Sequence, residues 1–94
     1  NFFCVRLTPE VYRTVGLFDE RFHPAGGEDD DYSIRAHLLG GDVRVAQDSY
    51  LLHFGGRSTW SGPESREEWA ARELRFSRVF AEKWGPTLAR MFLT

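Results

Sequence analysis

The sequence predicts an α/β fold, more closely an α+β fragment in which a short mixed sheet accompanies about three helices. The chain of 94 residues has 41% hydrophobic and 28% charged residues, which is the balance of a small globular domain. β-Branched and aromatic residues gather in short runs that suit strands, whereas other apolar residues recur at helical spacing. No stretch is long and apolar enough to predict a membrane span. The single cysteine, Cys4, excludes an internal disulfide, and we expect it to be a buried apolar residue.

The first part of the chain predicts a strand, a short helix and a long loop. Residues 1–7 are rich in aromatic and β-branched residues, as strands are. Thr8 is a good N-cap and Pro9 suits the first helical turn, so we expect a short helix that ends at Gly16. Residues 17–27 predict a loop, and a loop of this length in a small domain is usually functional.

The middle of the chain predicts a helix followed by two strands. Residues 28–39 place apolar side chains at helical spacing after four carboxylates, which the positive end of a helix dipole favours. Residues 42–46 alternate between polar and apolar side chains, and residues 49–54 form an apolar run, so both predict strands. Residues 55–63 are rich in glycine and polar residues and predict a loop.

The last part predicts one long amphipathic helix over residues 64–84. Its aromatic and aliphatic side chains form a broad apolar stripe. Gly85 and Pro86 end this helix, and residues 87–94 add a final helical turn. We therefore divide the chain into two parts, residues 1–63 and a C-terminal amphipathic helical segment of residues 64–94.

An acidic run opens the predicted middle helix. The run is Gly26-Gly27-Glu28-Asp29-Asp30-Asp31. Like charges at such short range repel one another, so a helix N-terminus, solvent or a ligand must offset the repulsion. A cluster of this kind can act as a general base, bind sugar hydroxyls or hold a divalent cation. It can equally be a solvated turn that caps a helix, and the residues alone leave both interpretations open.

A histidine and a glycine-rich loop follow about 25 residues later. His53 closes an apolar run, and an imidazole can bind a metal ion or a phosphate. The loop after it contains two glycines followed by Arg57 and Ser58, which suits a diphosphate. Each signal is weak alone, because a lone histidine is often structural and such loops are usually plain turns.

The order of these features resembles the acceptor-side half of GT-A-fold glycosyltransferases, especially bacterial family 2 enzymes. The run Val-Gly-Leu-Phe-Asp-Glu-Arg-Phe at residues 15–22 is similar to the family's G-x-F-D-E-x-F segment. Residues 28–35 resemble its E-D-x-D helix start, and residues 26–31 match the Gly-Gly-Glu-Asp-Asp-Asp run of the β-1,4-galactosyltransferases. His53 falls at the family's strand-end histidine, and Ser58 at its downstream hydroxyl.

The resemblance implies an inverting glycosyltransferase that moves a sugar from a nucleotide-sugar donor to a hydroxyl of a carbohydrate or glycolipid acceptor. Residues 1–63 would be its acceptor-binding and catalytic-base part, and Asp29 would be the base. Acceptor hydroxyls would be bound by Gly27, Glu28 and Asp30. His53 would hold a divalent cation, Mn²⁺ or Mg²⁺, in the full-length enzyme. The diphosphate would be bound by Arg57 and Ser58.

The resemblance also implies what this chain lacks. In the family, a nucleotide-binding half with a D-x-D metal motif lies upstream, so we expect this fragment alone to be inactive. The face left exposed would allow a domain-swapped homodimer. We expect a role in polysaccharide or glycolipid synthesis and a cytoplasmic location, with peripheral attachment to a membrane as an option. The net charge of −2 predicts no nucleic-acid partner.

Two other classes of protein fit the same residues. One is a non-catalytic carbohydrate- or divalent-metal-binding module that uses the acidic run and His53. The other is a helical interaction domain, in which the acidic run is only a helix cap and the aromatic helix is the binding surface.

Overall fold

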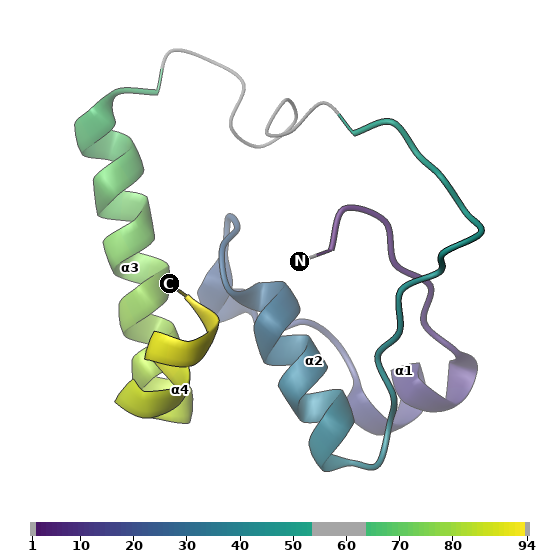
Figure 1. Ribbon diagram of the computed structural model, residues 1–94. Coiled ribbons are helices and arrows are strands. Elements are labelled where there is room, and N and C mark those ends of the chain that lie inside the picture. Colours follow the sequence, from purple (N-terminus) through teal and green to yellow (C-terminus); the bar gives the residue numbers. More distant parts are fainter. Residues whose placement is uncertain (1, 54–63, 94) are drawn as a thin grey trace.

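A computed structural model describes residues 2–53 and 64–93 of the chain, and the regular structure within them is helical. The long helix α3 lies beside the short α4, which folds back on it, and α2 lies between this pair and α1 (Figure 1). The elements in chain order are α1 (Pro9–Val15), the 3₁₀ helix η1 (Glu20–Phe22), α2 (Glu28–Leu38), α3 (Arg66–Trp84) and α4 (Pro86–Phe92).

The predicted mixed sheet is wrong for the part of the chain that the structure describes. No residue of 2–7, 42–46 or 49–53 belongs to a strand. A strand satisfies its backbone groups only by pairing with another strand, and no such ladder forms among the described residues. The first and second of these segments approach each other beside α2, where both line a pocket of about 110 Å³, yet they do not pair. The α/β class, and with it the sheet of a GT-A fold, is therefore corrected to a helical structure.

The predicted helices are confirmed. Local capping residues set their ends. The Thr8 hydroxyl accepts a hydrogen bond from the backbone N–H of Val11 at 3.3 Å, and Gly16 ends α1 with a φ of 85°. Ser65 and Glu68 form a reciprocal capping box at the start of α3. The long helix thus begins at residue 66 rather than 64, and α2 ends one residue earlier than predicted.

A small core joins the two predicted parts of the chain. The four buried hydrophobic residues among those described are Phe22, Tyr32, Ala36 and Phe80. The rings of Phe22 and Phe80 meet edge to face, with their centroids 6.2 Å apart. The apolar stripe of α3 is therefore packed near its C-terminal end, whereas Trp69, nearer the N-terminal end, is 49% exposed. No finding tests the division at residues 63 and 64, so it stays a prediction.

The turn before α2 lies directly against α3. Gly26 has a φ of 115°, and a Cβ atom there would lie 2.2 Å from the Phe76 ring. Only glycine combines this backbone conformation with such a close approach. By contrast Cys4 is exposed, so the expectation that it is buried is wrong.

Candidate functional site

The acidic run forms the first turn of α2, as predicted. Gly27 is the N-cap residue, in a left-handed conformation with a φ of 83°, and it is buried. Asp29 is 8% exposed. Its Oδ1 accepts a hydrogen bond from the backbone N–H of Asp30 at 2.9 Å, and its Oδ2 accepts one from the N–H of Phe2, also at 2.9 Å. The carboxylate therefore has a fixed orientation, set by its own helix and by the start of the chain.

The carboxylates on either side of Asp29 have different surroundings. Glu28 is half-buried and accepts a hydrogen bond from the backbone N–H of Gly26. Asp30 is also half-buried, and its pKa is raised, mainly by burial and then by the negative charges of Asp29 and Glu28. Asp30 therefore holds a proton more readily than an ordinary aspartate, chiefly because it is partly buried and in smaller part because its neighbours are negative.

The fourth carboxylate, Asp31, is structural. It is fully buried, and its Oδ2 accepts a hydrogen bond from Arg35 Nε, one helical turn away, at 3.0 Å. Its Oδ1 forms an ion pair with Lys83 Nζ at 2.7 Å and accepts a hydrogen bond from Trp84 Nε1 at 2.8 Å, both from the C-terminal end of α3. These contacts hold the acidic turn against α3.

Lys83 also extends this network to the loop before α2. Its Nζ lies 2.8 Å from Oδ2 of Asp19. Hydrogen bonds from Arg21 and then from Lys83 hold the pKa of Asp19 well below its ordinary value of 3.8. One ammonium group therefore bridges two carboxylates, one on the loop and one on the helix.

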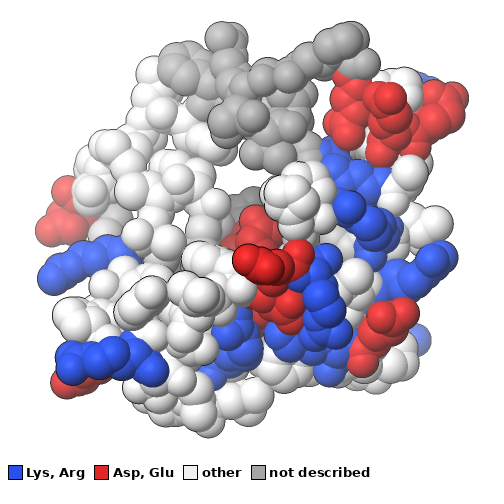
Figure 2. Space-filling view, turned by 180° about the vertical axis from the view of Figure 1, so that it is seen from behind, with Lys and Arg blue, Asp and Glu red and all other residues white. Residues whose placement is uncertain are grey.

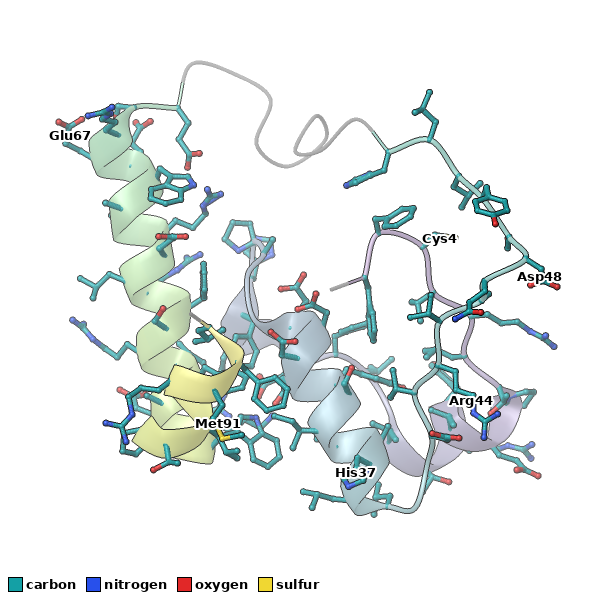
Figure 3. All side chains as sticks on the ribbon, viewed as in Figure 1. Cys4, His37, Arg44, Asp48, Glu67 and Met91 are labelled. Atoms are coloured by element: carbon teal, nitrogen blue, oxygen red, sulfur yellow. The ribbon has the colours of Figure 1, made fainter. Side chains whose placement is uncertain are left out.

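The predicted metal ligand His53 lies in an exposed, irregular segment rather than at the end of a strand. Its ring stacks on Phe3, with the centroids 4.6 Å apart and the planes 16° from parallel. The neighbouring Phe2 is hydrogen-bonded to Asp29. Phe2 and Phe3 together therefore link the acidic turn to the imidazole. Another histidine, His37, lies in the last turn of α2, away from the acidic turn (Figure 3).

The described residues do not form a complete metal site. Among residues 2–53 and 64–93, no three His, Cys, Asp or Glu side chains come together as ligands of one ion. A cation bound by His53 would need further ligands from elsewhere in the protein. The predicted diphosphate ligands Arg57 and Ser58 lie outside the described residues.

A pocket of about 540 Å³ opens beside the acidic turn, within the range of about 300–1,000 Å³ that is usual for ligand sites. The sequence predicted a functional loop here but singled out no residue of it for binding. The sequence feature that could have indicated a binding site is the mixture of aromatic and acidic side chains in this loop. Figure 2 shows acidic side chains gathered near the middle of the rear face, with basic side chains beside them. The pocket is lined by Phe18, Asp19, Glu20, Phe22, His23, Pro24 and Glu28.

The chain is similar to a galactofuranosyl glycosyltransferase of Leishmania donovani, with 32% identity over 73 residues, or 70% of this chain. No family model matches the chain, and no solved structure matches it. The similarity relates this chain to a glycosyltransferase.

The similarity covers only part of that relative. The chain spans 17% of the length of the glycosyltransferase that it matches. Separately, no helix in the described ranges has both the length and the hydrophobicity that crossing a bilayer requires.

Proposed function

We propose that this chain is the acceptor-binding and base-carrying part of an inverting glycosyltransferase. The enzyme would transfer a sugar from a nucleotide-sugar donor to a hydroxyl of a carbohydrate or glycolipid. The observation that carries the proposal is the similarity to the galactofuranosyl glycosyltransferase over 70% of the chain. The motif-level likeness to family 2 enzymes and to the galactosyltransferase acidic run is part of the same proposal.

The acidic turn supplies a chemically suitable base. An acceptor hydroxyl that attacks the anomeric carbon must lose its proton, and a carboxylate fixed beside the oxygen can take it. Asp29 has such a fixed orientation, because backbone N–H groups hold both of its oxygens. The acceptor oxygen forms a bond to the anomeric carbon, the bond to the nucleoside diphosphate breaks, and the proton moves to Asp29. Attack opposite to the leaving group inverts the configuration at that carbon.

The neighbours of Asp29 would hold the acceptor. Glu28 and Asp30 would accept hydrogen bonds from other acceptor hydroxyls. Gly27 is buried, and a Cβ atom there would lie 3.2 Å from the Phe22 ring, so its part would be to allow the tight turn that presents these carboxylates. Asp31 has no such role, since it is fully buried among Arg35 and the end of α3.

The divalent cation, Mn²⁺ or Mg²⁺, with His53 as one ligand, stays a proposal for the whole enzyme. Such an ion would neutralise charge on the leaving diphosphate. Donor binding measured with Mn²⁺ and with EDTA tests this role, and binding that EDTA leaves unchanged would contradict it. The donor site, the domain-swapped homodimer and the location in the cell likewise remain predictions.

The Asp29→Asn variant of the whole protein tests the base. We expect turnover to fall by about 10²–10⁴-fold, which is the usual contribution of a general base, while donor binding is retained. A nucleotide-linked galactofuranose is the first donor to use, because the relative is named for galactofuranosyl transfer. The matched control is Asp42→Asn, whose side chain is 67% exposed and which should keep full turnover. An Asp29→Asn enzyme as active as this control would refute the assignment.

A further inference from the structure

We propose that the pocket lined by Phe18, Glu20, His23 and Glu28 is a subsite for a neutral sugar residue of the acceptor. This inference rests on the proposed function and adds to it the position of the acceptor. The pocket holds about 540 Å³ and is formed by the loop before α2, by η1 and by the first residue of α2.

The pocket has apolar surfaces of the kind that sugar C–H groups contact. Phe18 is 42% exposed, and its ring leans on Tyr32 with the centroids 4.7 Å apart. Tyr32 is almost fully buried and donates a hydrogen bond to the backbone oxygen of Gly16 at 2.8 Å, so it gives Phe18 firm support. Pro24 and the exposed ring of His23 extend the lining. An aromatic wall that is already in place loses little conformational freedom when it binds a ligand.

The pocket also has acceptors for hydroxyl groups, and their charges argue against an anionic ligand. Glu20 is exposed and Glu28 is half-buried, so both carboxylates can accept hydrogen bonds from hydroxyls. An anionic ligand would be repelled by these groups. Asp19 adds little net charge to the pocket, because Arg21 and Lys83 neutralise it at 2.9 and 2.8 Å. The combination of apolar walls with hydroxyl acceptors suits a neutral polyol.

The position of the pocket relates it to the proposed base. Glu28 lines the pocket and directly precedes Asp29 in the first turn of α2. The contacts of Lys83 with Asp19 and Asp31 anchor both the pocket loop and this turn to α3. A sugar in the pocket would therefore contact the residue next to Asp29, which does not itself line the pocket, and binding energy from the pocket would help to position the acceptor.

Saturation-transfer NMR on the whole protein tests the subsite directly. The probes are methyl β-D-galactofuranoside and methyl β-D-galactopyranoside, at concentrations near the dissociation constant of about 1 mM expected for a weak single-sugar site. We expect saturation of at least one glycoside by the wild-type protein. Phe18→Ala and Glu20→Gln should each weaken its affinity about tenfold. Glu20→Gln changes an exposed side chain and guards against a fold defect in Phe18→Ala.

Two matched variants separate this inference from the proposed function. Glu10→Gln, at an exposed carboxylate of α1 outside the pocket, should bind the glycoside as the wild type does. Asp29→Asn should also keep the binding, although it loses turnover. No saturation by the wild-type protein, or affinity unchanged in both pocket variants, would overturn the subsite. Pocket-dependent binding in a protein without transferase activity would support the subsite and refute the transferase.

Discussion

The acidic turn is held by contacts with other described residues, whereas the segment of residues 42–53 forms no strand pairing with any of them. At the turn, Asp31 is fully buried and bonded to Arg35, Lys83 and Trp84. In the segment, by contrast, Val45 is 85% exposed, and no residue pairs in a strand with another described residue. A helix satisfies its backbone internally, whereas a strand depends on a neighbour. The turn is therefore structured by this chain, and the segment carries strand-forming residues without a described partner.

The largest expected effect comes from breaking the network at the turn. Asp31→Asn removes the charge that faces Arg35 and Lys83 in the interior, and we expect it to lower the free energy of unfolding by about 3 kcal/mol. Urea denaturation followed by far-UV circular dichroism measures the loss. The control is Asp42→Asn, which removes the exposed ion pair with Arg44 and should cost less than about 1 kcal/mol. Equal losses in the two variants would show that burial does not distinguish these carboxylates.

A smaller effect is expected where the turn meets α3. Gly26→Ala and Gly40→Ala both place a side chain at positive φ, 115° and 85°. The conformational cost is about 1–2 kcal/mol in each. Only at Gly26 does the new Cβ collide with Phe76, since nothing lies within 4 Å at Gly40. Gly26→Ala should therefore lower the midpoint of thermal unfolding clearly more than Gly40→Ala, and a reversed order would contradict the packing of α3 on the turn.

The smallest effect is a pH-dependent gain at Asp30. Its folded-state pKa is raised, so the ionised form destabilises the folded chain above that pKa, and this cost is absent below the ordinary value of 3.8. Asp30→Asn should therefore raise the free energy of unfolding at pH 7 by about 0.5 kcal/mol and leave it unchanged at pH 3. Denaturation at the two pH values measures this difference. A loss of stability at pH 7 would mean that the helix N-terminus favours the charge more than its neighbours oppose it.

The same contrast explains which parts of the fold were predictable. The ends of α1 and α3 follow from residues within one turn, such as Thr8, Gly16 and Ser65. The strands were predicted from composition alone, which cannot say whether a partner segment is available. The propensity was present, but the pairing is non-local, and the described residues do not supply it.

The candidate site divides in a similar way. The acidic turn lies within a few residues and follows from the sequence, and the ion pair between Asp31 and Arg35 is equally local, at a spacing of four residues. The contact between Trp84 and Asp31 spans 53 positions in the sequence, so no local pattern indicates it. The pocket also escaped prediction, because its residues come from a loop whose path is set by Gly26 lying on Phe76 and by the salt bridge between Lys83 and Asp19.

The adjacent residues Phe2 and Phe3 connect Asp29 to the ring of His53. Any alcohol that approaches Oδ2 of Asp29 competes with the Phe2 amide already bonded there. If that amide is displaced, the peptide unit carries Phe3 with it, and the stack on His53 is disturbed. A ligand bound at Asp29 would thereby also change the surroundings of the His53 ring.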